Sequence, residues 1–130
     1  MKIELDSNVS GKNRISAYSS KGLLIGDTLY QSSVVLTPEH IVTDWPPQRF
    51  SDLAAQHFNT IIELAPEIVL LGTGEQLQFP DPEILFPLVS ENIGFEIMDT
   101  GAACRAYNFL MGEERKVVAA LLTIKTERTT

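Results

Sequence analysis

The sequence predicts an α/β protein with three layers: a central mixed, largely parallel sheet, helices on both of its faces and an N-terminal β meander. Three observations predict this class. Short apolar segments separated by glycine turns fill the first third of the chain. From residue 51 onward, helical and strand patterns alternate, which is typical of parallel strands joined by helices. Two strand segments, residues 68–71 and 117–122, are continuous apolar runs of the kind that a sheet buries on both faces.

Closely spaced strands are predicted in the first third of the chain, at residues 14–19, 22–25, 28–31 and 33–37. Glycine-containing turns separate the first three, so we expect an antiparallel meander. Residues 34–36 are consecutive apolar residues and predict a strand covered on both sides. A further strand expected at residues 41–45 must end at Pro46-Pro47. Trp45 there is either a ligand platform or, as we interpret it, a plug at the edge of the core.

The remainder of the chain predicts three helices, each followed by a strand. The helices are expected at residues 52–64, from Asp81 onward and at 100–112, and the strands at 67–71, 95–98 and 115–124. Ser51 is expected to cap the first helix and Thr100 the third. Asp81, a proline and an acid form the start signal of the second helix. The face expected to be buried in that helix consists of Ile84, Leu85, Leu88 and Val89.

Length, charge and cysteine usage limit what this chain can be. Its 130 residues fit one domain, 1–130, with loose ends expected at 1–13 and 125–130. No apolar run approaches the ~18 residues of a membrane span, and no signal peptide is apparent, so a cytoplasmic location is expected. A net charge of −7 argues against a nucleic-acid surface, which needs a basic patch. A single cysteine cannot form an internal disulfide.

The candidate site lies where two predicted parallel strands end. If residues 67–71 and 95–98 are neighbours, as the helix between them implies, their carboxyl ends lie side by side and frame a crevice. The residues expected around it are Gly72, Thr73 and Gly74 on one wall and Asp99, Thr100, Gly101, Ala102, Arg105 and Asn108 on the other. Free N–H groups at a helix start favour an anion, and Arg105 adds a bidentate donor. A small anionic ligand is the partner that this arrangement predicts.

A structural interpretation of the same residues stays open. Asp99 is itself an acid at the helix entry, where it can fill the place of an anion. It would cap the helix together with Thr100, while Arg105 pairs with Glu113 or Glu114. The glycines of the 72–74 turn serve turn geometry and close ligand approach equally well. The direction of the Arg105 side chain distinguishes the two interpretations.

The sequence does not support several familiar chemistries. The Gly-Thr-Gly turn lacks the third glycine of a dinucleotide fingerprint, because Leu77 stands in its place. Cys104 beside Arg105 is a candidate thiolate, but neither His40 nor His57 can be placed near it as a base, so we interpret it as buried. We interpret His57 as a boundary histidine of the first helix. One cysteine and two separated histidines give no metal-ligand spacing, so no catalytic residue, metal or cofactor is predicted.

Two motifs at a characteristic spacing carry a family resemblance. They are Leu71-Gly72-Thr73-Gly74 and Met98-Asp99-Thr100-Gly101-Ala102-Ala103-Cys104-Arg105, followed by Tyr107-Asn108, Arg115 and an Ala-rich apolar strand. This pattern resembles a small α/β family of unknown function that includes mitochondrial respiratory complex I assembly factor 3 and short bacterial homologues. The resemblance implies a three-layer fold with no established catalytic residue. The chain departs from the family pattern at Ala106, where Thr is frequent, and at Glu114, where Gly is frequent.

Two functions remain open from the sequence. The resemblance, and the lack of a nucleophile–base pair, favour a non-catalytic protein-interaction or assembly-factor-like module with a protein partner. The alternative is a small-molecule or anion-binding protein, or an enzyme, that uses the crevice between the Gly72–Gly74 turn and the helix start at Thr100. An apolar surface beside the loop at residues 45–50 would support the first function. An Arg105 side chain directed into the crevice would support the second.

Overall fold

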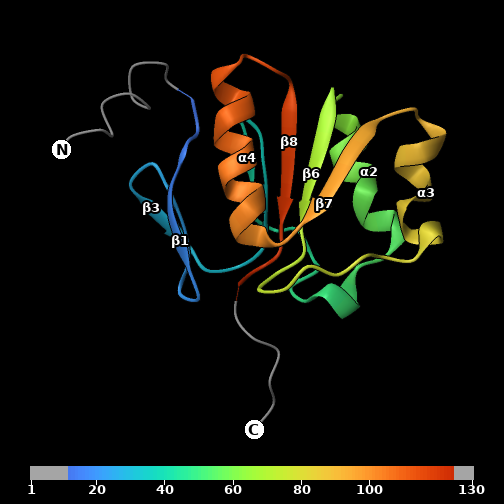
Figure 1. Ribbon diagram of the computed structural model, residues 1–130, viewed down its shortest axis with the longest axis horizontal. Coiled ribbons are helices and arrows are strands. Elements are labelled where there is room, and N and C mark those ends of the chain that lie inside the picture. Colours follow the sequence, from blue (N-terminus) through green and yellow to red (C-terminus); the bar gives the residue numbers. More distant parts are fainter. Residues whose placement is uncertain (1–11, 125–130) are drawn as a thin grey trace, which may run out of the picture.

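The computed structural model describes residues 12–124, which form an α/β fold with two sheets (Figure 1). Strands β1 (Ile15–Ser19), β2 (Gly22–Ile25) and β3 (Thr28–Tyr30) pair in sequence order and antiparallel, so the predicted meander is confirmed. The ends predicted to be loose, 1–13 and 125–130, lie outside the described residues except for residues 12 and 13. Within that pair, the Asn13 N–H donates to the Pro38 carbonyl at 2.8 Å.

The central sheet has five strands and mixed direction. Its order is β5 (Ile41–Val42), β4 (Val34–Leu36), β8 (Val117–Leu121), β6 (Ile68–Gly72) and β7 (Gly94–Met98). Strand β6 pairs in parallel with β7 and β8, whereas β4 is antiparallel to both β8 and β5. The mixed sheet is therefore confirmed, with parallel pairing confined to its three C-terminal strands. Strand β4 follows the meander in the sequence but belongs to the central sheet.

Helices cover both faces of the central sheet, as predicted. Helix α4 (Thr100–Gly112) packs on one face together with the meander, and α2 (Asn59–Glu63) and α3 (Pro82–Ser90) lie on the other (Figure 1). Successive residues of β6 and β8 alternate between the two hydrophobic cores. All five residues of β8 are at most 2% exposed, which explains why this strand is apolar without interruption.

The first predicted helix, at residues 52–64, is wrong in its extent. Two 3₁₀ turns, η1 (Phe50–Asp52) and η2 (Ala55–Phe58), precede α2, which has only five residues. Leu53 interrupts the helical path because it has extended backbone angles and inserts its side chain into the core. A buried anchor at this point outweighs the modest preference of the sequence for a helix.

In this segment, side chains satisfy backbone N–H groups that a longer helix would have bonded to its own carbonyls. The Asp52 carboxylate, not Ser51, closes the first turn, and it accepts the N–H groups of Gln48 and Arg49 at 3.1 Å each. His57 Nδ1 accepts the Ala54 N–H at 3.0 Å, so His57 is a boundary histidine as interpreted. The Trp45 indole is 2% exposed and donates to the His57 carbonyl at 2.9 Å. Trp45 therefore packs at the edge of the core, as interpreted from the sequence. Strand β5 ends at Val42, three residues earlier than predicted.

Helix α3 starts where the sequence predicts, with Asp81 at the N-cap position and Pro82 as its first residue. Its buried face is narrower than predicted. Leu88 is fully buried, but Val89 is 54% exposed. The buried stripe is centred on Leu88, and Val89 is rotated by about 100° from it on a helix with 3.6 residues per turn. Across residues 12–124, no helix is long and apolar enough to cross a bilayer.

Candidate functional site

The ends of β6 and β7 lie side by side, as the sequence predicts. The two strands are parallel, and Gly72 stands opposite Met98 in the register. The two walls of the predicted crevice are nevertheless in direct contact. A Cβ atom on Gly72 would lie 2.9 Å from both Cα and Oγ1 of Thr100, so this glycine is required by close packing against the helix start.

Thr100 is the centre of this contact and is fully buried. Its hydroxyl donates to the Leu122 carbonyl at 2.8 Å and accepts the Gly74 N–H at 2.8 Å. Its own N–H donates to the Gly74 carbonyl at 2.9 Å. One threonine therefore connects the end of β6, the start of α4 and the residue that follows β8. We call these bonds the Thr100 junction.

The helix is capped by Asp99 rather than Thr100, which corrects the prediction. The Asp99 carboxylate accepts the Ala102 N–H at 2.8 Å, and its carbonyl accepts the Ala103 N–H at 2.9 Å. Thr100 cannot cap because its side chain faces inward to the junction. The N–H groups of Ala102 and Ala103 at the start of α4 are therefore already bonded within the chain and are not free for an anion.

Thr73 stabilises the opposite wall and is 2% exposed. Its hydroxyl donates to the Gln76 carbonyl at 2.7 Å and accepts the Gln78 N–H at 3.1 Å. Its N–H donates to the Met98 carbonyl at 2.9 Å. The polar groups between the two walls of the predicted crevice thus bond to one another within the protein.

A shallow pocket of about 280 Å³ lies beside the Thr100 junction. It is lined by Tyr18, Ser19, Gly74, Glu75, Asp99, Gly101, Arg105 and Ile124. Four of these residues belong to the predicted site: Gly74, Asp99, Gly101 and Arg105. Two carboxylates, those of Asp99 and Glu75, share this lining with the guanidinium of Arg105.

Arg105 has a partner that sequence reasoning missed. Its Nη1 donates to the Tyr18 hydroxyl, and its guanidinium carbon lies 6.0 Å from the centre of the Tyr18 ring. Among residues 12–124 this contact replaces the expected pairing with Glu113 or Glu114. Tyr18 lies on β1, 87 positions before Arg105, and no sequence pattern indicates on which helix the meander packs.

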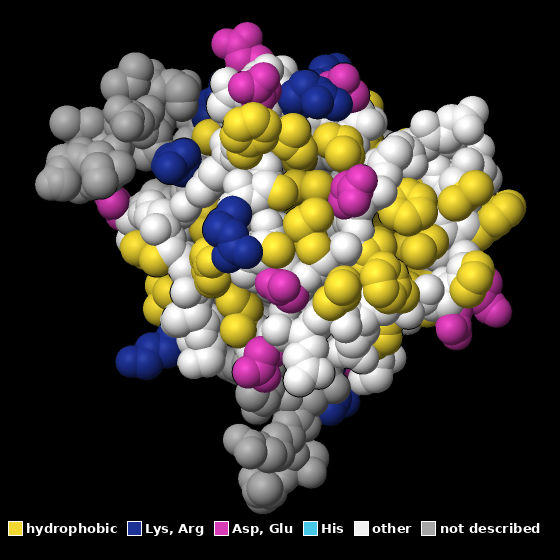
Figure 2. Space-filling view, in the orientation of Figure 1, with side chains coloured by type: hydrophobic (Ala, Val, Ile, Leu, Met, Phe, Trp, Pro, Cys, Tyr) yellow, Lys and Arg dark blue, Asp and Glu magenta, His cyan; other side chains and the backbone are white. Residues whose placement is uncertain are grey.

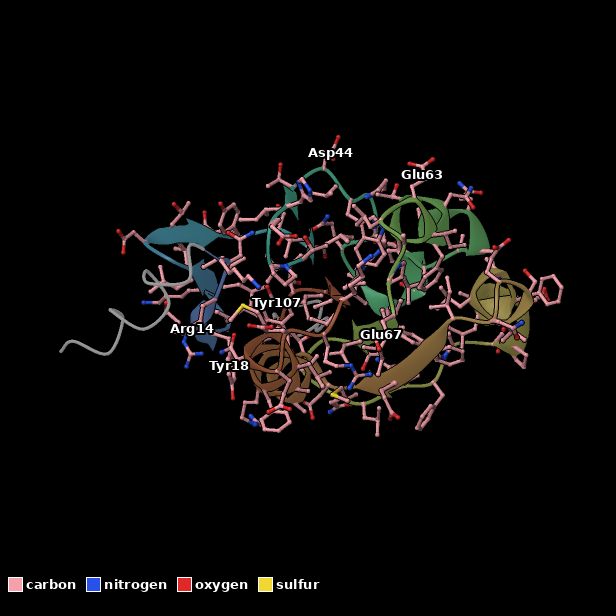
Figure 3. All side chains as sticks on the ribbon, turned by 90° about the horizontal axis from the view of Figure 1, so that it is seen from above. Arg14, Tyr18, Asp44, Glu63, Glu67 and Tyr107 are labelled. Atoms are coloured by element: carbon pink, nitrogen blue, oxygen red, sulfur yellow. The ribbon has the colours of Figure 1, made fainter. Side chains whose placement is uncertain are left out.

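Asn108 lies outside the pocket and binds the meander. Its Oδ1 accepts the Ile15 N–H at 3.0 Å and its Nδ2 donates to the Ile15 carbonyl at 2.8 Å, so it pairs with β1 as a neighbouring strand would. Tyr107 donates its hydroxyl to the Asn13 carbonyl at 2.7 Å. Figure 3 shows Tyr107 between α4 and the N-terminal strands. Arg105, Tyr107 and Asn108 together attach the meander to α4.

Cys104 is buried, as interpreted from the sequence. It is a free thiol that is 1% exposed. Burial raises the pKa of this thiol to about 12, and the nearby positive charge of Arg105 offsets only part of that effect. The neutral thiol therefore dominates at physiological pH, which is unfavourable for a nucleophile. In the described part of the chain no three His, Cys, Asp or Glu side chains are grouped as metal ligands.

A second pocket, of about 420 Å³, lies at the opposite end of the parallel strands. It is bordered by the loop at residues 37–40 and by the segment that leads into β8. Its lining includes the acidic residues Glu39, Glu63 and Glu114 and the basic residues His40, Arg115 and Lys116. Arg115 is already paired with Glu67 at 3.2 Å, and both side chains are about half exposed. This mixture of exposed charges selects no particular ligand.

Comparison with known proteins gives a family for this chain. Residues 15–122 match the family described as "Protein of unknown function (DUF498/DUF598)". The chain belongs to this family. A crystal structure from Bordetella parapertussis superposes with a TM-score of 0.81 at 37% identity, covering 86% of this chain and 96% of that one.

Several curated relatives carry the name NADH dehydrogenase [ubiquinone] 1 alpha subcomplex assembly factor 3, and a curated relative from Francisella tularensis, 33% identical over 51% of this chain, is named 13 kDa major membrane protein. The Mus musculus protein is 34% identical over 83% of this chain and 59% of its own length. The Danio rerio protein is 31% identical over 91% of this chain and 68% of its own length. The family resemblance is therefore confirmed, and the chain spans about three fifths of the length of most curated relatives that it matches.

Proposed function

We propose that this protein is a non-catalytic interaction module that assists the assembly of other proteins. Relatives that are about one third identical are named assembly factors. The observation that carries the proposal is the use of the motif's polar groups within the chain. Asp99, Thr100, Tyr107 and Asn108 all bond to the backbone of this same chain. Polar groups that are bonded in this way stabilise the fold, and few of them remain available to take part in a reaction.

Partner capture and assembly measurements test this proposal. The full-length tagged chain is cross-linked in its source cell and recovered at near-physiological salt, with a tagged unrelated protein of similar charge as control. We expect a defined protein partner, and we expect removal of the chain to slow the appearance of a multi-subunit complex on native gels. Normal assembly and a capture profile equal to the control would contradict the proposal. Cell fractionation tests the cytoplasmic location that belongs to it.

A second candidate is a small-anion site in the pocket beside the Thr100 junction. The position of Arg105 on that pocket, away from Glu113 and Glu114, favours this candidate. The carboxylates of Asp99 and Glu75 on the same lining weigh against it. The test is the shift in thermal unfolding with phosphate, sulfate, citrate and nucleotides. Arg105→Ala should abolish any shift while Tyr18→Phe retains it, and an equal response of wild type and Arg105→Ala would eliminate the site.

A further inference from the structure

Four large apolar side chains are exposed on one short segment of the chain. They are Leu77 (49% exposed), Phe79 (70%), Phe86 (61%) and Val89 (54%), and we call them the α3 surface. Phe86 and Val89 are three residues apart and share one side of α3, whereas Leu77 and Phe79 lie on the segment that leads into it. The α3 surface is not the loop at residues 45–50, where an apolar surface would have supported an interaction module and where Trp45 is buried.

The charge around the α3 surface has a single sign. Between Arg49 and Arg105 the sequence contains nine Asp and Glu residues and no Lys or Arg. Asp81, Glu83 and Glu91 at the two ends of α3 are exposed, and none of them forms an ion pair among residues 12–124. Figure 2 shows apolar side chains gathered over α3 and β7, with acidic but no basic side chains among them on the face in view.

We propose that the α3 surface binds an amphipathic segment of a protein partner, apolar on one side and rich in Lys and Arg on the other. This inference rests on the proposed function and names the surface and the chemistry of the partner. Exposed apolar side chains gain roughly 25 cal/mol for each Å² that a partner covers. The surrounding acids attract a basic segment and increase its association rate.

The same charges disfavour other occupants. A second copy of the chain would bring Asp81, Glu83 and Glu91 against an equally acidic surface, and like charges in contact are repulsive. Anionic lipid and nucleic acid are repelled for the same reason. A basic partner segment is the occupant that satisfies both the apolar side chains and their acidic surroundings.

Two synthetic peptides of equal apolar content test the proposal. One carries Leu on one helical face and Lys on the other, and the second has Glu in place of every Lys. Each is titrated with the full-length protein by fluorescence anisotropy. We expect the Lys peptide to bind, with an affinity that falls as salt screens the charges, and the Glu peptide not to bind.

Matched variants locate the binding. Phe86→Gln combined with Val89→Gln should weaken the Lys peptide at least about tenfold, because apolar anchors dominate interface energy. Phe109→Gln on α4, a phenylalanine that is 67% exposed outside this surface, should leave the affinity unchanged. Glu83→Lys combined with Glu91→Lys should reverse the preference toward the Glu peptide. Circular dichroism and urea unfolding confirm that each variant is folded.

Several results would overturn this inference. The first is that both peptides bind equally, and the second is that the α3 double variant and Phe109→Gln bind the Lys peptide with equal affinity. The third is that the wild type dimerises with increasing concentration and the double variant does not, which would indicate a second copy. The fourth is that the wild type co-sediments with phosphatidylglycerol vesicles and the double variant does not, which would indicate a lipid surface. Cellular capture separates this inference from the proposed function. If wild type and the double variant recover the same partner equally, the α3 surface is not the binding site, but the protein is still an interaction module. No partner recovered by wild type removes the proposed function itself.

Discussion

At the scale of single residues, the polar side chains of the sequence motif mainly form hydrogen bonds to backbone groups of the same chain. The hydroxyl of Thr100 satisfies one N–H and one carbonyl from two different strands' ends. Asn108 does the same for both polar groups of Ile15. Buried backbone groups that lose such partners cost about 1–3 kcal/mol each. These hydrogen bonds therefore contribute to the stability and the geometry of the fold.

Substitution of Thr100 should show this directly. Thr100→Val keeps the shape but removes the hydroxyl, leaving the Gly74 N–H and the Leu122 carbonyl without a partner. We expect a loss of roughly 2–4 kcal/mol in the free energy of unfolding, measured by urea titration. Thr100→Ser keeps the hydroxyl and removes one methyl group, so it should cost only about 1 kcal/mol. A Val variant as stable as the Ser variant would show that these bonds add nothing.

Cys104 should make the protein less stable at alkaline pH. Its pKa rises from 9.0 to about 12 on folding, so above pH 9 the unfolded chain loses a proton that the folded chain keeps. The free energy of unfolding then falls as pH rises between about 9 and 12, by at most about 1.4 kcal/mol per pH unit. Below pH 9 the contribution is constant. Cys104→Ala should reduce this slope in denaturant titrations at several pH values, and an unchanged slope would assign it to other groups.

At the scale of elements, each of the helices α2, α3 and α4 is followed, two residues after its last residue, by a non-glycine residue with a left-handed backbone. Ala65, Asn92 and Glu114 have φ of 53°, 57° and 63°. At the end of α4 the Glu114 N–H donates to the Met111 carbonyl at 3.0 Å and the Arg115 N–H to the Leu110 carbonyl at 3.2 Å. This is the Schellman arrangement, in which glycine is preferred at the left-handed position.

A glycine at the end of α4 should therefore stabilise the protein. Glu114→Gly relieves the steric cost of a left-handed residue, and we expect a gain of about 0.5–1 kcal/mol after the added entropy of the unfolded chain. Glu113 immediately before it has an ordinary φ of −87°, so Glu113→Gly is the matched control and should lose stability. The measurement is the midpoint of thermal or urea unfolding. Equal shifts in both variants would contradict the backbone explanation.

At the scale of the whole molecule, the meander is a small sheet attached to the body through α4. Its apolar residues Ile15, Leu23 and Ile25 pack in the same core as α4. The side chains of Arg105 and Asn108 bond to it, and Tyr107 bonds to Asn13 just before it. Within residues 12–124, none of its strands pairs with a strand of the central sheet. The meander is thus a structural unit whose stability depends on one helix face, and we expect it to open before the central sheet does.

Hydrogen exchange on an Asn108 variant tests this dependence. Asn108→Ala removes the acceptor of the Ile15 N–H, so we expect faster exchange at Ile15 and across β1 and β2, while β6 and β8 stay protected. Asn108→Asp keeps an acceptor and should restore much of the protection at Ile15. A uniform rise in exchange over both sheets would show that the meander and the central sheet unfold as one unit.

The sequence alone determined the elements whose signals are local or continuous. The apolar runs of β6 and β8, the start of α3, the parallel neighbours β6 and β7 and the burial of Cys104 follow from pattern, length and composition. The family followed from the two motifs at their spacing. These features depend on residues that are close in the chain or on the simple need to bury apolar surface.

Only the tertiary structure decided how the candidate site is used. Thr100 became an internal junction, Asn108 an attachment for β1 and Arg105 a partner of Tyr18 through contacts 22 to 93 residues apart. The extended backbone at Leu53, which divides the expected helix, depends on the core into which that side chain packs. Each of these contacts depends on which elements pack together in the folded chain. The local sequence does not indicate whether a polar side chain at a helix start will bond to a ligand or to the chain itself.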